Sequence, residues 1–231
     1  MSRKTNTSNK RKRVRGNLVK RAAVLKAAEK VFAQRGFHEA TISEIATKAG
    51  VSEGLIYEYF TNKEALLFSI PGEKSSRFRE ENLGILKYVD GAANKLKILI
   101  YRHLELFELN PDYANITVMI LRNNRNFLKT DEYKVVRSSA QLTIDVIKEG
   151  IENGEFRKGI DPYTIRSIIW GSIDSAVKRK FLYDKKFDLL AYSESFIDVL
   201  FNGILANQDK PNLNLRVIVE HPDESEISDI A

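Results

Sequence analysis

The 231-residue sequence contains no cysteine, which excludes disulfide bonds, thiol nucleophiles and zinc–thiolate sites. It also lacks any run approaching the ~18 apolar residues that a membrane-spanning helix requires. The N-terminus is basic, yet it has no apolar core of the kind that defines a signal peptide. We therefore expect a protein of the cytoplasm with no membrane partner.

Hydrophobic residues make up 43% of the chain and include 12 phenylalanines, which excludes wholesale disorder. Along most of the chain these residues recur every three or four positions, the spacing of one helix face. One such stripe comprises Leu18, Ala22, Leu25, Ala28 and Phe32, and Gly36 ends it. Further stripes predict helices over residues 42–49, 53–60, 96–107, 113–127, 133–151, 162–182 and 188–206, and a helix from residue 63 in which Pro71-Gly72 favours a bend. The sequence thus predicts an all-α fold of about nine helices.

Positive charge is concentrated at the N-terminal end. Residues 1–70 contain 14 Lys and Arg against 6 Asp and Glu, whereas the rest of the chain contains 23 against 25. Such asymmetry is typical of a protein that binds a polyanion, with nucleic acid as the first candidate and an anionic membrane as the second. From charge alone, a solvated basic face is the alternative.

The stretch AGVSEGLIYEYF, residues 49–60, contains a glycine where a helix built for stability would have Ala, Lys or Glu. Glycine in a helix costs about 1 kcal/mol relative to alanine, so another requirement must favour it. The stretch joins two short predicted helices through Gly50-Val51-Ser52, the length and turn chemistry of a helix-turn-helix. In that motif the second helix enters the DNA major groove.

The second helix of this motif has an inward and an outward side. The inward positions are Leu55, Ile56 and Phe60. Gly54 and Tyr57 point the other way, and a glycine there lets the backbone approach DNA closely. Tyr57 and Tyr59 can donate their hydroxyls to phosphates, although half-buried packing is the alternative for both.

Three further residues of this region suit phosphate binding. Thr41 and Ser52 lie at helix N-termini, where backbone N–H groups favour an anion. Lys63, at the start of the next helix, adds a charged donor.

The stretch ATISEIATKAGVSEGLIYEYFTNKEAL, preceded by AAEKVFAQRGF, resembles the DNA-binding domain of the TetR family of bacterial transcriptional repressors. The resemblance covers residues 18–67. It implies an Ω-shaped homodimer that binds palindromic operator DNA, with the last two helices of the core forming a four-helix interface. It also implies DNA contacts at the positions occupied by Thr41, Ser52, Gly54, Tyr57, Tyr59 and Lys63. Glu53 departs from the family pattern. An acid at this position repels phosphate and can instead accept a hydrogen bond from a cytosine amino group.

The resemblance and the charge pattern together divide the chain into four segments. Residues 17–68 are expected to form the DNA-binding domain and residues 69–206 the ligand-binding and dimerisation domain. Residues 1–16 contain seven Lys and Arg and no acid, and they are expected to be a disordered basic arm, either reaching the minor groove or adding nonspecific affinity. Residues 207–231 are expected to be a tail that ends in acidic sequence.

The candidate ligand residues lie in the C-terminal half. His103 and Phe107 share an apolar stripe, and Met119 lies in the run Ile116–Leu121; each is either a core residue or a pocket residue. Arg122 and Arg125 follow that run and either end a helix in solvent or hold an anionic group. Trp170, the only tryptophan, serves either the pocket or the dimer interface.

A second resemblance bears on the ligand. EGIENGEFRKGIDPYTIRSIIWGSIDSAV, followed by FDLLAYSESFIDVLFNGIL, resembles the C-terminal half of TetR-type repressors of fatty-acid degradation, the FadR-like group. This implies a repressor of fatty-acid metabolism genes that long-chain acyl-CoA releases from its operator. The alternative is a TetR-type sensor of drugs or other hydrophobic molecules that controls efflux.

Other function classes fit the sequence poorly. The three histidines are far apart and lack any catalytic or metal-binding motif, so we expect no enzyme activity, no metal site and no cofactor apart from the small-molecule effector. A nonspecific protein of the nucleoid or of a membrane surface would use the basic arm without sequence preference. As a repressor, the protein would be associated with the nucleoid when bound to DNA.

Overall fold

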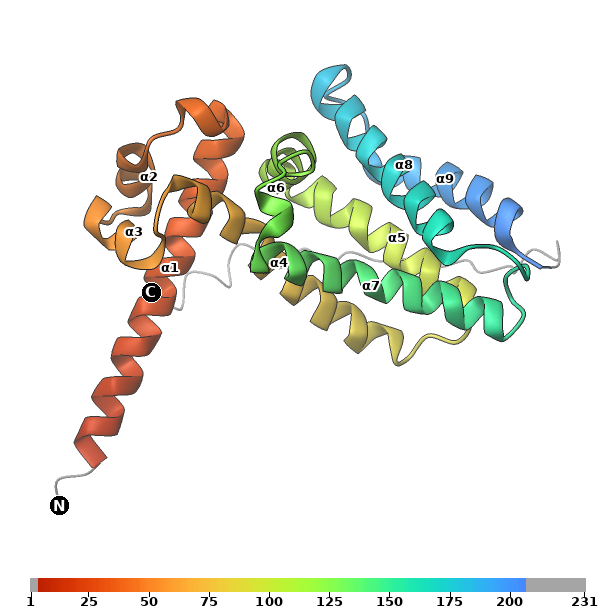
Figure 1. Cartoon of the computed structure of the whole chain (residues 1–231), viewed down its shortest axis with the longest axis horizontal. Coiled ribbons are helices and arrows are strands. Elements are labelled where there is room, and N and C mark those ends of the chain that lie inside the picture. The colour runs from red at the N-terminus through yellow and green to blue at the C-terminus, as the bar shows by residue number, and fades with distance from the viewer. Residues whose placement is uncertain (1–3, 207–231) are drawn as a thin grey trace, which may run out of the picture.

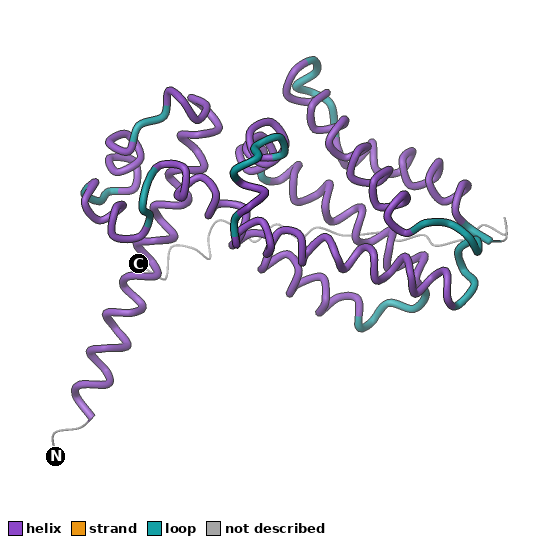
Figure 2. Tube along the Cα trace, in the orientation of Figure 1, coloured by secondary structure: helices purple, strands orange, loops and turns teal. Residues whose placement is uncertain are grey.

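The computed structural model describes the backbone of residues 4–206 and the side chains of residues 16–206. Over this range the chain forms nine α-helices, a π-helix and a short 3-10 helix, joined by short connections (Figures 1 and 2). The only extended pairing among these residues is a single bridge between Phe156 and Leu205. The prediction of an all-α fold is confirmed.

The N-terminal part consists of α1 (Lys4–Glu39), α2 (Ile42–Ala49) and α3 (Glu53–Tyr59). The C-terminal half of α1 packs on both short helices, and the rest of α1 extends away from the molecule (Figure 1). Gly36 interrupts α1 with φ 75° and ψ 172°, a conformation open to glycine because it has no Cβ.

Helix α1 begins earlier than the sequence analysis predicts. Residues 4–16, expected to be a disordered arm, continue the helix, whereas residues 1–3 lie outside the described range. The physical reason is that extending an existing helix costs far less than nucleating one, and this stretch contains no proline and is rich in Lys and Arg, which are good helix formers. The acidic tail, residues 207–231, also lies outside the described range.

Helix α4 (Lys63–Leu86) runs from the N-terminal part into a bundle of helices (Figure 1). It continues through Pro71, where the sequence favours a bend, although proline removes one backbone hydrogen bond there. The bundle also contains α5 (Ala92–Leu109), α7 (Asp131–Glu152), α8 (Pro162–Leu182) and α9 (Leu189–Ile204). Helix α7 packs against α4, α5 and α8, and α9 packs against α5 and α8.

The segment predicted as one helix over residues 113–127 is divided. It contains α6 (Pro111–Asn115), the π-helix η1 (Ile116–Leu121) and, after a turn, the 3-10 helix η2 (Phe127–Lys129). Periodicity alone does not reveal this division, because a continuous apolar run fits several helix types.

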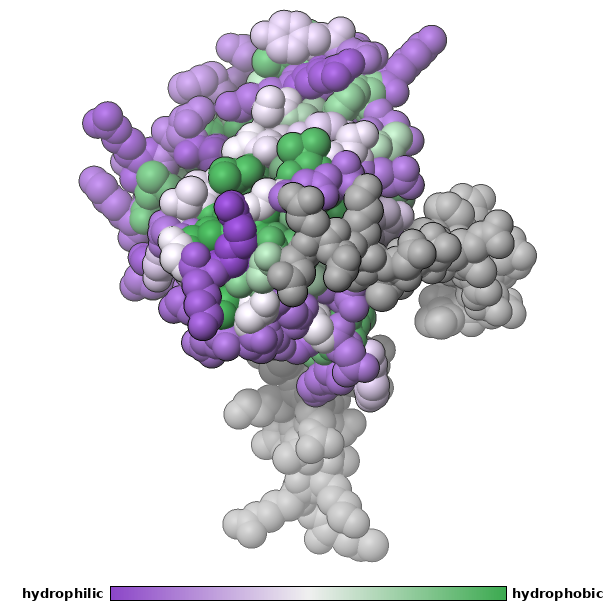
Figure 3. Space-filling view, turned by 90° about the vertical axis from the view of Figure 1, so that its right-hand side faces the viewer, coloured by the Kyte–Doolittle hydropathy of each residue, from purple (hydrophilic) through white to green (hydrophobic). Residues whose placement is uncertain are grey.

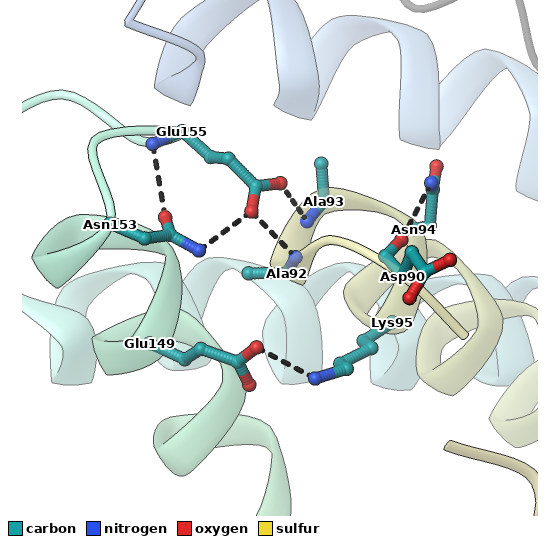
Figure 4. A network of polar contacts seen from close by, with 8 residues as sticks. All are labelled: Asp90, Ala92, Ala93, Asn94, Lys95, Glu149, Asn153 and Glu155. Carbon is teal, nitrogen blue, oxygen red and sulfur yellow. Dashed lines mark hydrogen bonds and ion pairs between the residues drawn. The ribbon is translucent and has the colours of Figure 1, made fainter. Parts of the chain in front are cut away.

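One carboxylate fixes the far end of the bundle. Glu155, in the loop between α7 and α8, accepts hydrogen bonds from the backbone N–H groups of Ala92 and Ala93, both at 2.9 Å (Figure 4). The side-chain amide of Asn153 donates a further hydrogen bond to the Glu155 carboxylate at 2.7 Å. Burial raises the pKa of Glu155, but these hydrogen bonds outweigh that effect and lower it. Glu155 therefore caps the N-terminus of α5 as an anion.

The surface at this end of the molecule is mixed. Where undescribed residues do not cover it, hydrophilic residues dominate and apolar residues form separate patches (Figure 3). In the described part of the chain, no helix combines the length and apolarity needed to cross a membrane.

Candidate DNA interface and ligand cavity

Helices α2 and α3 are held in place by caps that the sequence specifies. Thr41 accepts a hydrogen bond from the N–H of Glu44 at 3.1 Å, and Ser52 accepts one from the N–H of Leu55 at 3.3 Å. Gly50 ends α2 with φ 67°, the left-handed conformation that favours glycine. On the inner side, Ile45 and Ile56 have no exposed surface. The two helices therefore form a helix-turn-helix with one buried and one open face.

Five of the seven predicted DNA-contacting residues lie on the open face. They are Thr41, Ser52, Glu53, Gly54 and Tyr57. Tyr57 leaves 53% of its surface exposed. A Cβ added at Gly54 would meet only Ser52 Oγ, at 4.0 Å, so the fold itself does not require glycine there. Its retention at a stability cost is consistent with a function at this surface.

The other two predicted contacts are placed differently. The hydroxyl of Tyr59 is buried, since residue 59 lies one turn from the buried Ile56, and it does not reach the open face. Lys63 Nζ donates to the backbone oxygens of His38 at 3.2 Å and Ala40 at 2.8 Å, where it caps the end of α1. One of its three donors remains for a phosphate. Lys48, exposed in the last turn of α2, is a cation of this face that the sequence analysis did not single out.

A cavity of about 80 Å³ lies inside the bundle between α4, α5, α6, η1, α7 and α8. Of the six predicted ligand residues, His103, Phe107, Arg122 and Trp170 line it. Ligand sites in proteins usually measure about 300–1,000 Å³. A long ligand therefore enters only if side chains or helices move apart.

Met119 and Arg125 do not line this cavity, and their positions match the alternatives of a core residue and a solvent-exposed arginine. In a π-helix the residues that share a face are five apart, and the N–H of Arg122 bonds to the oxygen of Thr117 at 3.1 Å. Thr117 and Arg122 consequently face the cavity, whereas Met119 packs half-buried against the core. Arg125 is exposed in the turn after η1.

Among the described residues, those that line the cavity include arginines and no carboxylate. Besides Arg122, the lining includes Arg79 on α4, Arg137 on α7 and Arg166 on α8. Arg122 pairs with Asp174 at 2.6 Å, whereas the other three form no ion pair with the described residues. The sequence alone did not single out these three arginines, although each lies within three positions of an apolar cavity residue, Phe78, Val136 or Ile169. This lining favours a ligand that is partly apolar and partly anionic.

Several buried polar atoms around the cavity have no hydrogen-bond partner among the described residues. They are Arg79 Nε, His103 Nε2, Thr117 Oγ1, Arg122 Nε, Arg166 Nε and Trp170 Nε1. His103 is enclosed by rings, with the centroids of Trp170 and Phe107 at 4.1 and 4.6 Å. Burial, and secondarily the charge of Arg122, lower the pKa of His103 to about 3. The imidazole is therefore neutral at physiological pH.

Contacts connect the cavity to the N-terminal part, α1 to α3. Lys74 Nζ on α4 bonds to Glu29 on α1 at 2.9 Å and to Asn110 at 3.0 Å, and it lies 4.8 Å from the ring centre of Tyr113. Tyr113 lines the cavity. Asn115 donates to the backbone oxygen of Ala33 on α1 at 3.1 Å. A change in the cavity can thus move α1 and α4, on which α2 and α3 depend.

Two family models match the chain. Residues 24–70 match the model of bacterial regulatory proteins of the tetR family, and residues 72–203 match the C-terminal region of YsiA-like proteins. The match boundary lies at Pro71, inside α4.

Individual proteins agree with these matches. A fatty acid metabolism regulator protein of Bacillus subtilis is 34% identical over 181 residues, which is 78% of this chain and 93% of that protein. The crystal structure of the transcriptional regulator FadR from Bacillus subtilis in complex with stearoyl-CoA is similar with a TM-score of 0.74 and 33% identity, covering 79% of this chain and 98% of that one. The fatty acid degradation regulator FadR from Bacillus halodurans has a TM-score of 0.73 and 32% identity over the same shares.

Proposed function

Because the chain belongs to the TetR family of bacterial regulatory proteins, we propose that it represses fatty-acid metabolism genes and is released from its operator by long-chain acyl-CoA. The observation that supports this effector is the cavity: apolar walls, four arginines and no carboxylate. An acyl-CoA has an apolar chain and anionic phosphates, and it matches both properties. A cationic drug, the alternative effector of an efflux regulator, would be repelled by unpaired arginines.

The DNA-binding role rests on the open face of α2 and α3. The N-cap residues Thr41 and Ser52 present helix N-termini to phosphates, and Gly54 lets α3 approach the major groove. Glu53 and Tyr57 are the exposed side chains of α3 available to read base edges. We expect no catalysis and no metal, and we expect the protein to act in the cytoplasm on nucleoid DNA.

The protein is proposed to act as a homodimer through α8 and α9. Both helices present stripes of small or apolar residues to solvent, with Ile168 46% and Val199 73% exposed. Gly171 and Gly203 lie on the same exposed stripes, and a Cβ at either would have nothing within 4 Å. Small residues allow two helix pairs to approach closely. In such a dimer the two α3 helices would meet successive major grooves about 34–36 Å apart.

Release follows from the size of the cavity. Since about 80 Å³ cannot hold a long acyl chain, the ligand binds only to an expanded conformation. Expansion moves Tyr113 and α4, and Lys74 passes this movement to α1. The spacing of the two α3 helices then no longer fits the operator.

Two measurements test the proposal. Selection from random DNA should yield a palindrome bound at least ~10³-fold more tightly than nonspecific DNA. Titration with palmitoyl-CoA should change the fluorescence of Trp170, the only tryptophan, whereas free CoA should not. A protein that selects no sequence is not a repressor, and a protein whose tryptophan responds to neither compound does not use acyl-CoA as its effector.

A further inference from the structure

Four of the unpartnered polar atoms belong to one cluster inside the cavity. We define the polar cluster as His103, Thr117, Arg122 and Trp170. His103 lies on α5, Thr117 lies in η1, Arg122 directly follows η1, and Trp170 lies on α8. The rings of His103 and Trp170 are 4.1 Å apart, and the guanidinium carbon of Arg122 lies 5.5 Å from the ring centre of Trp170. The backbone N–H of Arg122 bonds to the backbone oxygen of Thr117 within the π-helix, and the side chains of both residues line the cavity. All four side chains of the polar cluster thus line the same cavity.

The chemistry of the polar cluster favours one kind of ligand atom. The Trp170 indole and the Arg122 Nε can only donate hydrogen bonds, and the Thr117 hydroxyl can donate as well. Buried donors normally have acceptors, so a group that supplies an acceptor here is bound favourably. The matching ligand atom is a hydrogen-bond acceptor such as a carbonyl or carboxylate oxygen.

The charge at the polar cluster distinguishes between these two acceptors. The charge of Arg122 is balanced by Asp174 at 2.6 Å, and His103 is uncharged at neutral pH. A carboxylate would bring an uncompensated negative charge into this buried region, which is costly. A neutral carbonyl brings none. The lining cations that pair with no carboxylate of the described residues are Arg79, Arg137 and Arg166, which are not members of the polar cluster.

We infer that the polar cluster binds the thioester carbonyl of the acyl-CoA, with the acyl chain among the apolar walls and the phosphates near Arg79, Arg137 and Arg166. This inference rests on the proposed function and deepens it. The polar cluster would then discriminate acyl thioesters from free fatty acids. A free fatty acid has no phosphates for the arginines, and its carboxylate would place a negative charge at the polar cluster.

The test compares three ligands on the full-length protein by isothermal titration calorimetry. They are palmitoyl-CoA, the thioether S-hexadecyl-CoA, which lacks only the carbonyl oxygen, and palmitate. The wild-type protein should bind the thioester at least roughly tenfold more tightly than the thioether, because the thioether leaves the donors unpaired. Palmitate should bind more weakly still.

Two conservative variants locate the effect. Trp170→Phe keeps an aromatic ring without the N–H, and Thr117→Val keeps the shape without the hydroxyl. Each should reduce the thioester-to-thioether ratio to roughly threefold or less, because a donor that is absent no longer favours the ligand that has the carbonyl. Thr143→Val is the matched control, because Thr143 lines the cavity outside the polar cluster, and it should keep the wild-type ratio.

The outcomes separate this inference from the proposed function. Equal binding of thioester and thioether by the wild type would refute the carbonyl site and leave the acyl-CoA effector intact. Palmitate binding as tightly as palmitoyl-CoA would refute the charge argument. Failure to bind either CoA compound would refute the proposed function and this inference with it.

Discussion

Replacing Gly54 with alanine should make the protein more stable and a weaker DNA binder. Gly54 is the second residue of α3, and its backbone is helical without a positive φ. An added Cβ would be 4.0 Å from Ser52 Oγ, an ordinary contact, so the folded state accommodates alanine without strain. The only surface that the new methyl group changes is the one proposed to face DNA.

The magnitudes follow from these facts. Alanine is favoured over glycine by about 1 kcal/mol in a helix interior, and near the N-terminus of a seven-residue helix we expect about half of that gain. On DNA, a methyl group that holds the backbone off the groove should cost about 1 kcal/mol per half-site, comparable to one mismatched base pair. Two half-sites give about 2 kcal/mol, or roughly 30-fold weaker operator binding.

The assay combines urea unfolding with fluorescence anisotropy on the selected operator. Gly84→Ala is the matched control, since Gly84 is exposed in α4 and a Cβ added there would have nothing within 4 Å. This control should raise stability without changing DNA affinity. If Gly54→Ala binds the operator within twofold of the wild type, the reasoning that glycine is retained for close approach to DNA is wrong.

Three further changes test other parts of the account. Glu155→Gln should lower the free energy of unfolding by about 1 kcal/mol at pH 7, as removal of a helix cap does. The pKa of Glu155 is lowered in the folded state, so the stability difference between wild type and variant should persist above the unfolded-state pKa and disappear as the pH falls through the folded-state pKa. Urea unfolding across pH 3–7 measures this difference. Deleting residues 1–15 should weaken operator binding and make it less dependent on salt. The slope of the logarithm of the binding constant against the logarithm of the salt concentration should become shallower by about 0.9 for each phosphate that the shortened protein no longer neutralises. Lys74→Met should keep operator affinity but reduce release by palmitoyl-CoA several-fold in anisotropy titrations, because it removes the ion pair of Lys74 with Glu29 that links α4 to α1 beside Tyr113. Arg77→Met breaks only an exposed pair with Glu81 and should leave release unchanged.

The helix-turn-helix can be predicted from the sequence because its determinants are local. Thr41, Ser52 and Gly50 specify caps and a turn within a few residues, and the structure places them as helix caps. The burial of the Tyr59 hydroxyl and the backbone contacts of Lys63 depend on how α1 packs against α3 and α4, and no local pattern encodes that packing.

The ligand cavity can be predicted only in part, since six elements contribute to it. His103, Phe107, Arg122 and Trp170 are recognisable in the sequence as unusual residues on or beside apolar faces. Met119 does not line the cavity, because α-helical periodicity does not hold where the chain forms a π-helix, and a ligand contact there stays a prediction. The three unpaired arginines lie on three separate helices, and only the tertiary fold brings them together.

The most direct test of the central claim is an anisotropy titration of the full-length protein on labelled DNA from upstream of its own gene, with and without palmitoyl-CoA. A repressor released by long-chain acyl-CoA should bind this DNA sequence-specifically, and micromolar palmitoyl-CoA should abolish the binding, while equal concentrations of free CoA and palmitate leave it intact. Specific binding that saturating palmitoyl-CoA does not change would contradict it.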